Sequence, residues 1–417
     1  MRRFLLLFVV SFLVPALSAC TGTFEPSNPV LLVTGYRDDA GSHVALIEDS
    51  FGETGPSEDR LRFLPDSVQN LPAPAASYDI VDREGTRNTL VVLSRGAVVA
   101  GNSTSYLTFL SLRSIDPDNP VNFEPTRLPR VISRDTVTLP DTLTNPQFCP
   151  SSVQVTQTGA YAAVLNEPGL CRFGGQPFID IFSLQTEPIR LLQRINRVAA
   201  GGFYLGQSPA QDLLYYATNE SRSLRLQRAT LPRPGETFGP DDTVTVETVA
   251  DVTSTIGNDF VDLGRSGISG DERERLVVLF EESLVNVTGF TGEGTASEAI
   301  VTPPNNARVV RDDQCDTEAT LILGTLEARR FSYVPTSTSE EDVELEVESA
   351  SVAAVDAVIE PTNGFVYFAA NGGVLLFDLN SYNSGDTLPD PTPFPVTSLP
   401  NPSFITWAQS VPAPATP

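Results

Sequence analysis

Short apolar runs rich in Val, Leu, Phe and Tyr recur along the chain, and clusters of Gly, Pro, Asn and Asp separate them. Almost no segment keeps the 3.6-residue periodicity of an amphipathic helix, so the pattern predicts an all-β protein. Seven pairs of runs have the spacing of β-hairpins, and their first strands recur at intervals of roughly 45 to 75 residues. The predicted pairs are 30–35 with 43–47, 89–93 with 106–112, 160–165 with 178–184, 213–218 with 224–229, 276–280 with 284–290, 319–323 with 331–334, and 364–370 with 374–379.

One of these pairs has a second interpretation. Residues 272–287 would also place Leu276, Leu279 and Leu284 on one side of an amphipathic helix. The apolar run at 276–280 is continuous rather than periodic, however, and a Glu-Glu-Ser break follows it. Continuous runs that contain valine favour strands, so the sequence predicts a hairpin here.

Some of the predicted hairpins share a sequence pattern. Residues 216–219 read Tyr-Ala-Thr-Asn and are followed by Ser-Leu-Arg-Leu at 223–226, which resembles the YVTN repeat of bacterial surface propellers. Residues 367–371, Tyr-Phe-Ala-Ala-Asn, look similar, and residues 160–166 are a weaker match. The resemblance covers about three of the units, and it implies a β-propeller body.

Packing arguments also favour a propeller. A four-stranded blade cannot bury both of its faces alone, whereas blades around an axis cover one another. A domain at 30–410 gives roughly 54 residues per blade, so we expect seven blades, within a range of six to eight. Two β-sandwich domains of about 190 residues each are the alternative. In a propeller, the strand at 404–407 is expected to close the ring beside residues 30–33, and the tail at 411–417 is expected to be disordered.

The N-terminal segment predicts export and a lipid anchor. Arg2 and Arg3 precede an apolar run at 4–13 that is too short for a membrane-spanning helix. Residues 17–20 read Leu-Ser-Ala-Cys, which resembles the lipobox of bacterial lipoproteins. The resemblance implies a signal peptide at 1–19, acyl chains on Cys20 and a spacer at 20–29. An ordinary cleaved signal peptide is the alternative.

The same resemblance predicts where the protein resides. Lipidated Cys20 would hold the body on the outer side of the membrane, in the cell envelope. Thr21 stands where an aspartate would resemble a signal for retention at the inner membrane. We therefore expect the outer membrane in an organism that has one.

The amino-acid composition limits the kinds of functional site that the chain can form. The chain has 52 acidic residues, 27 basic residues that are all arginine, and one histidine. A Schiff-base lysine, a P-loop lysine and a metal site built on several histidines are therefore excluded. The formal net charge is −25, and it becomes −27 once residues 1–19 are removed. Such a charge argues against a nucleic-acid partner, and it leaves membrane attachment to the acyl chains.

The cysteines predict one disulfide. Cys149 and Cys171 are 22 residues apart, and a bridge between them would close a loop worth about 3 kcal/mol. Cys315 is left over, and pairings through it stay open at this point. The acidic residues beside Cys315 disfavour its thiolate, so a nucleophilic role is not expected.

The other chemistry-bearing residues have plainer structural explanations. His43 lies on an apolar strand and no G-x-S-x-G motif occurs, so we expect a structural or surface histidine. The alternating acidic segment at 340–348 is expected to be an outer edge strand. Acidic pairs and loops are expected to be solvated turns rather than catalytic carboxylates or calcium sites, namely residues 38–39, 116–119, 241–242 and 312–316.

Arginines gather at one place in the sequence. Arg190, Arg194 and Arg197 form the densest basic cluster. Such a cluster would contact an anionic wall polymer, and solvated strand faces explain it as readily.

The sequence therefore predicts a lipid-anchored, extracytoplasmic propeller that acts as a non-catalytic binding or scaffolding module, with no metal and no cofactor. Its partner would be an envelope protein or a cell-wall polymer. The alternative is a propeller hydrolase that acts on glycosides or lactones through Asp, Glu and Arg in the central channel. A quinone-dependent propeller is disfavoured because Trp407 is the only tryptophan.

Overall fold

The computed structural model describes most of the chain from Val30 onward. The predicted signal peptide, Cys20, the spacer, Cys315 and the tail at 411–417 lie outside the described residues. No helix among the residues described has the length and apolar character needed to cross a membrane. The described ranges are 30–49, 60–83, 86–99, 102–113, 122–125, 129–132, 148–172, 174–186, 189–207, 211–220, 223–233, 244–252, 260–266, 275–300, 303–310, 319–335, 343–360, 365–378, 392–396 and 398–409.

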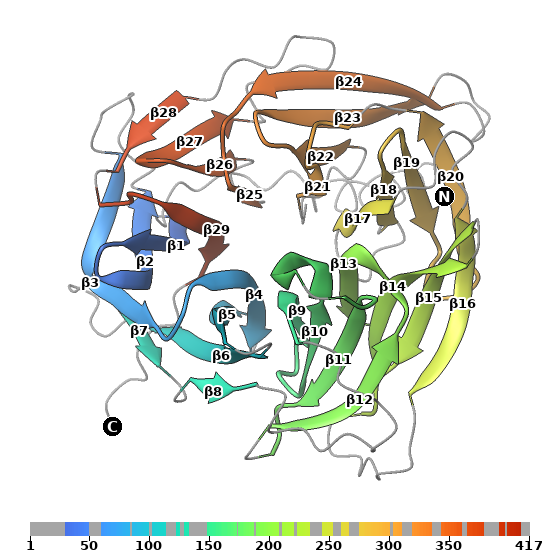
Figure 1. Ribbon diagram of the computed structural model, residues 1–417. Coiled ribbons are helices and arrows are strands. Elements are labelled where there is room, and N and C mark those ends of the chain that lie inside the picture. The colour runs from blue at the N-terminus through green and yellow to red at the C-terminus, as the bar shows by residue number, and fades with distance from the viewer. Residues whose placement is uncertain are drawn as a thin grey trace, which may run out of the picture.

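Seven antiparallel sheets stand around a central axis (Figure 1). The inner strands are β29 (Pro402–Ala408), β4 (Ala75–Arg83), β9 (Pro150–Val155), β13 (Val198–Gln207), β17 (Phe260–Ser266), β21 (Arg308–Val309) and β25 (Asp356–Glu360). The second strands are β1 (Val30–Asp38), β5 (Thr86–Val99), β10 (Tyr161–Asn166), β14 (Asp212–Glu220), β18 (Arg275–Phe280), β22 (Ala319–Leu323) and β26 (Phe365–Ala370). The protein is a seven-bladed β-propeller.

Two further strands complete each blade. The third strands are β2 (Gly41–Asp49), β6 (Asn102–Arg113), β11 (Phe178–Ser183), β15 (Ser223–Thr230), β19 (Ser283–Thr288), β23 (Glu327–Pro335) and β27 (Gly373–Asp378). The outer strands are β3 (Leu61–Leu71), β7 (Asn122–Pro125), β12 (Arg190–Asn196), β16 (Thr245–Val252), β20 (Thr295–Ile300), β24 (Val343–Ser351) and β28 (Thr392–Pro395). A short strand, β8 (Arg130–Val131), also pairs with β6.

Each of the seven predicted hairpins forms the second and third strands of one blade. The segment 272–287 contains β18 and β19, so the hairpin prediction is confirmed there and the helix is not formed. Residues 343–348 of the acidic segment lie in β24, which is the outermost strand of its blade as predicted, and residues 340–342 lie outside the described residues.

The ring closes where the two ends of the body meet. β29 pairs with β1, and the register places Trp407 opposite Leu32 and Ile405 opposite Thr34. The predicted closure by residues 404–407 beside residues 30–33 is therefore confirmed. One blade thus contains strands from both ends of the chain, so opening the ring would require this strand pair to separate.

The hydrophobic core is divided into seven layers, and each layer lies between two neighbouring blades. The layer at the closing junction joins Leu32 and Trp407 of one blade to Tyr367 of its neighbour. The second strand of each blade is buried on both faces over most of its described length, so these strands read as apolar runs rather than alternating ones. This arrangement supplies each blade with the partner surface that it cannot form alone.

Candidate functional site

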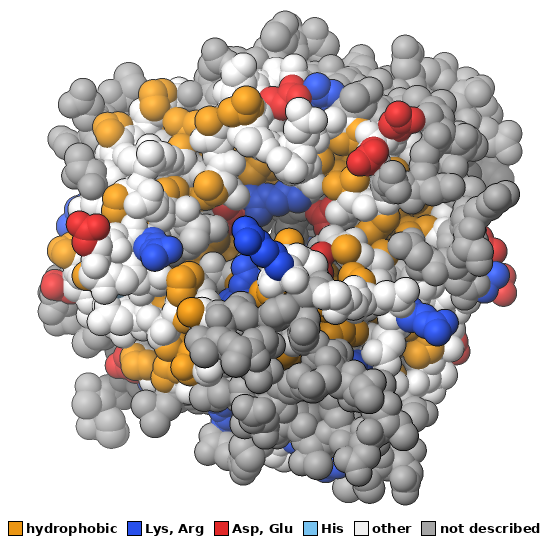
Figure 2. All heavy atoms as spheres, in the orientation of Figure 1, with side chains coloured by type: hydrophobic (Ala, Val, Ile, Leu, Met, Phe, Trp, Pro, Cys, Tyr) orange, Lys and Arg blue, Asp and Glu red, His pale blue; other side chains and the backbone are white. Residues whose placement is uncertain are grey.

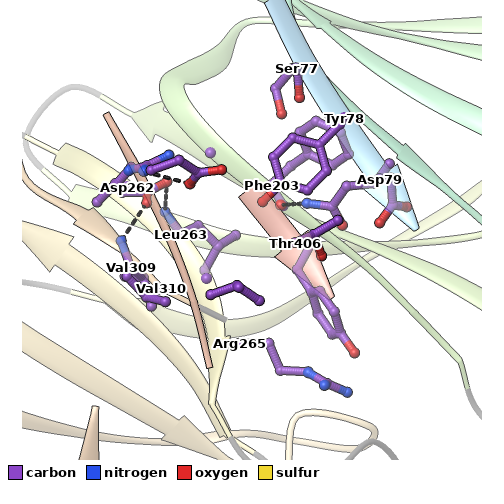
Figure 3. Close-up of a pocket in the computed structure, with 18 of the residues that line it drawn as sticks. Ser77, Tyr78, Asp79, Phe203, Asp262, Leu263, Arg265, Val309, Val310 and Thr406 are labelled. Carbon is purple, nitrogen blue, oxygen red and sulfur yellow. Dashed lines mark hydrogen bonds and ion pairs between the residues drawn. The ribbon is translucent and has the colours of Figure 1, made fainter. Parts of the chain in front are cut away.

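A cavity of about 260 Å³ lies on the propeller axis, and residues from all seven inner strands line it (Figure 3). One end of this channel, which we call the mouth, is formed where the inner strands begin, at residues such as Ser77, Ser152, Asp262 and Ser403. Figure 2 shows arginine side chains gathered at the central hollow of one face, with acidic side chains beside them. Charged side chains are therefore concentrated around the axis at this face.

Three aspartates of the channel wall hold neighbouring blades together. The Asp79 carboxylate accepts a hydrogen bond from the backbone amide of Val155 in the next blade, at 2.6 Å. Asp262 accepts one from Val309 at 2.9 Å, again in the next blade (Figure 3). The other carboxylate oxygen of each of these aspartates accepts the amide of the residue that follows it.

The third aspartate acts in the same way at the junction where the ring closes. Asp356 accepts the amide of Ile405 at 2.8 Å and the amide of Ala357 at 2.9 Å. Each of the three carboxylates thus satisfies a backbone donor of the adjacent inner strand, which would otherwise be unpaired at the channel wall.

The remaining four junctions between inner strands use other groups. Gln154 accepts the amide of Leu205 at 2.6 Å, and the hydroxyl of Tyr78 donates to the carbonyl of Ile405 at 2.9 Å. Between β13 and β17 there is a close backbone approach, because a Cβ on Gly202 would lie 2.7 Å from the amide nitrogen of Leu263. The wall is therefore continuous around the axis.

Arg308 forms the seventh junction, and it is the more exposed of the two described arginines that line the channel. Its Nη2 donates to the Asp356 carboxylate at 2.6 Å and to the carbonyl of Val355 at 2.8 Å. Its side chain keeps 39% of its surface exposed. Arg308 also lines a shallow groove that leads outward from the mouth between two blades, beside Ala354 and the half-exposed Val355. A ligand that enters the mouth would meet this guanidinium.

Two features set the electrostatics of the channel. Burial raises the pKa of Asp262, and the amides of Val309 and Leu263, together with the charge of Arg308, oppose that rise. Deeper in the channel, Arg265 is 4% exposed and its guanidinium carbon lies 5.8 Å from the ring centre of Tyr204. Among the described residues, no group of three His, Cys, Asp or Glu side chains is placed to hold a metal ion.

The predicted disulfide lies near the mouth. Cys149 and Cys171 are bonded, with their Cα atoms 6.0 Å apart, so the pairing prediction is confirmed. The bridge joins the residue just before β9 to a 3-10 helix at Pro168–Cys171. Beside it, the carboxylate of Glu167 accepts the amide of Gly201 at the mouth, at 3.1 Å.

His43 is structural, as expected. It is 7% exposed, and its ring nitrogens contact Asn70 and Asp38, both at 2.9 Å. Asp38 and Asp39 lie at the turn between β1 and β2, which also agrees with the prediction. The acidic stretches at 116–119, 241–242 and 312–316 lie outside the described residues.

The prediction for the arginine cluster is wrong at its central member. Arg190 and Arg197 are exposed, but the side chain of Arg194 is only 6% exposed. Arg194 donates two hydrogen bonds to the Asp180 carboxylate, at 2.6 and 2.7 Å, and its guanidinium lies over the ring of Phe178. The strand register places Arg194 directly opposite Asp180, so the two charges pair instead of facing solvent.

None of the residues that line the channel was predicted from the sequence to form a site. The sequence does contain a signal for the three aspartates that join the blades. Each of Asp79, Asp262 and Asp356 is followed by an apolar residue and lies 8 to 14 residues before a predicted hairpin. This signal is short and irregular, and it becomes meaningful only once the inner strands are seen to be neighbours.

Comparisons with known proteins identify the fold and no family. No family model matches the sequence, and no curated protein is similar to it. The solved structures that resemble it include a periplasmic gluconolactonase from Pseudomonas aeruginosa, with a TM-score of 0.56 and 13% identity. A protein from Lactobacillus plantarum has a TM-score of 0.49 and 11% identity. Each of the two structural alignments covers 92% of this chain and 100% of the chain compared with it.

Proposed function

We propose that the mature protein is a lipid-anchored propeller of the cell envelope that binds a ligand or partner at the mouth of its channel without catalysing a reaction on it. The observation that supports this most directly is the use of the channel carboxylates. Asp79, Asp262 and Asp356 each accept amides from their own strand and from the next blade. A catalytic carboxylate must offer an oxygen or a proton to the substrate, and these groups already have structural partners.

Recognition at the mouth would depend on Arg308. This residue borders both the channel and the outward groove, and a guanidinium offers several donors in a fixed geometry. An envelope protein or a cell-wall polymer with acidic or carbonyl groups would suit it. The exposed Val355 at the edge of the groove adds an apolar contact beside the charge.

The binding proposal can be tested by capture from detergent-solubilised envelopes with the full mature protein as bait. Wild type, Arg308→Gln and a control variant, Glu293→Gln, would be compared, since Glu293 lies in an exposed turn that lines no part of the channel. One partner recovered equally by wild type and Glu293→Gln, and at least tenfold less by Arg308→Gln, would support the proposal. A partner retained equally by all three would place recognition elsewhere.

Lactone hydrolysis is the second candidate. The fold is like that of the periplasmic gluconolactonase, and Asp262 is a carboxyl of raised pKa close to Arg308 at the mouth. The assay is turnover of gluconolactone above its spontaneous rate. Turnover by wild type that Asp262→Asn abolishes, while the variant still unfolds cooperatively, would replace the binding proposal with the hydrolase.

The anchor has a separate test. Mass spectrometry of the mature protein should find acyl chains on an N-terminal Cys20, and Cys20→Ser should move the protein to the soluble fraction. An unmodified Cys20 in membrane-bound protein would contradict the anchor and leave the binding proposal standing.

A further inference from the structure

Both ends of the described body lie at the same end of the channel. β29 starts at the mouth, where Ser403 and Phe404 line the opening, and runs down to Trp407 in the deeper part. β1 is antiparallel to it, and its register places Leu31 opposite Ala408. Val30 therefore lies at the end opposite the mouth, which we call the far face, and Ala408 lies there too.

The length of the chain between Cys20 and Val30 limits how the propeller can be oriented on a membrane. Ten residues span at most about 33 to 36 Å when fully extended. To bring the mouth against the bilayer, this segment would have to pass outward over β2 and β3 and then along the full height of the blade. Two strand spacings add about 10 Å and the nine residues of β1 add about 30 Å, which together exceed the reach of the segment.

We infer that the far face is turned toward the bilayer and that the mouth opens away from it. This inference rests on the anchor at Cys20 described above. The partner of the mouth is therefore reached from the aqueous side, and the ligand of Arg308 is a soluble or wall-bound molecule rather than a lipid headgroup of the same membrane.

The experiment measures the distance of each face from the lipid surface. Single cysteines are placed in a Cys315→Ser background, and Cys149 and Cys171 stay bonded. Gln157→Cys and Glu293→Cys mark exposed turns of the far face, and Asp39→Cys and Leu326→Cys mark exposed turns of the mouth face. Lipidated protein labelled with a donor dye is inserted into phosphatidylethanolamine and phosphatidylglycerol vesicles that carry an acceptor dye on their headgroups.

Energy transfer should be several-fold stronger from the far-face positions than from the mouth positions. Equal transfer from the two faces, or stronger transfer from the mouth positions, would overturn the inferred orientation while the anchor stands. Failure of the anchor is seen separately, because the protein would then carry no acyl chain and would not float with the vesicles. In that case the inferred orientation falls together with the anchor.

Discussion

The carboxylate of Asp356 accepts a hydrogen bond from the backbone amide of Ile405 at 2.8 Å, across the junction where the two ends of the chain close the ring. The same carboxylate pairs with Arg308 from the blade on its other side. A single side chain thus ties together three consecutive inner strands at the mouth. Removing the Asp356 side chain should therefore lower the stability of the fold and shift the position of Arg308.

We predict that Asp356→Ala lowers the free energy of unfolding by about 2 to 3 kcal/mol. The variant leaves the Ile405 amide without its acceptor and Arg308 without its counterion, and the partial exposure of Arg308 moderates the cost. Urea denaturation followed by fluorescence measures the change. Asp356→Asn is the matched control, because its amide oxygen still accepts from Ile405, and it should cost about 1 kcal/mol. Equal effects of the two variants would mean that the acceptor at this position is unimportant.

The closing strand should be required for the whole ring. Deleting residues 403–409 removes Ile405 and Trp407 from the core layer that joins the first and last blades, and it leaves the edge of β1 unpaired. Because the blades support one another in a ring, we expect the variant to show no cooperative thermal transition. Deleting residues 411–417 is the control and should leave the melting temperature unchanged. A cooperative transition at the wild-type temperature in the first deletion would argue against closure by β29.

The second strand of each blade could be predicted from the sequence because it is buried on both faces over most of its length. Runs such as 90–93 and 276–280 are continuously apolar, and this signal survives without any knowledge of the neighbours. The inner strands face the channel, so they contain glycine and charge. β13 carries Gly201 and Gly202, and β17 carries Asp262, which makes both look like turns.

The site was harder to predict than the fold because its pairs are distant in the sequence. Asp356 and Ile405 are 49 residues apart, and Asp262 and Val309 are 47 apart. Only the ring brings these segments together. Arg194 shows the same limit over a shorter range, since its burial depends on the register that sets it opposite Asp180. Single residues with a local role, such as His43 in its strand, were predicted correctly.

The disulfide should stabilise the region near the mouth. Cys149→Ser together with Cys171→Ser is expected to lower the free energy of unfolding by about 3 kcal/mol, since the bridge spans 22 residues. Chemical denaturation without reducing agent measures the loss. Cys315→Ser should leave stability unchanged, because Cys149 and Cys171 pair with each other. A comparable loss in the Cys315 variant would contradict this pairing.

Gly202 should tolerate no side chain. A Cβ at this position would lie 2.7 Å from the amide nitrogen of Leu263 and closer still to the carboxylate of Asp262. Gly202→Ala must therefore push β13 away from β17, and we expect a loss of about 1 to 3 kcal/mol. The control is Gly174→Ala, since a Cβ there meets nothing within 4 Å. Thermal denaturation of the two variants compares them, and equal melting temperatures would disprove the close approach of the strands.

The pair formed by Asp38 and His43 predicts a defined response to acid. The hydrogen bond from His43 is the main cause that lowers the pKa of Asp38 from its ordinary 3.8; slight burial opposes it, and the amides of Ala40 and Gly41 reinforce it. A carboxyl whose pKa is lower in the folded state stabilises the fold above its unfolded pKa, and this contribution is lost as the pH falls through the folded value.

The stability difference between wild type and Asp38→Asn should therefore shrink toward zero as the pH falls below about 4 and Asp38 becomes protonated in the folded protein. Urea midpoints measured over this range test it. In a His43→Gln background the main cause of the lowered pKa is absent, so the effect of Asp38→Asn on stability should depend much less on pH. A difference that persists unchanged in strong acid would show that Asp38 acts through its turn geometry rather than through its charge.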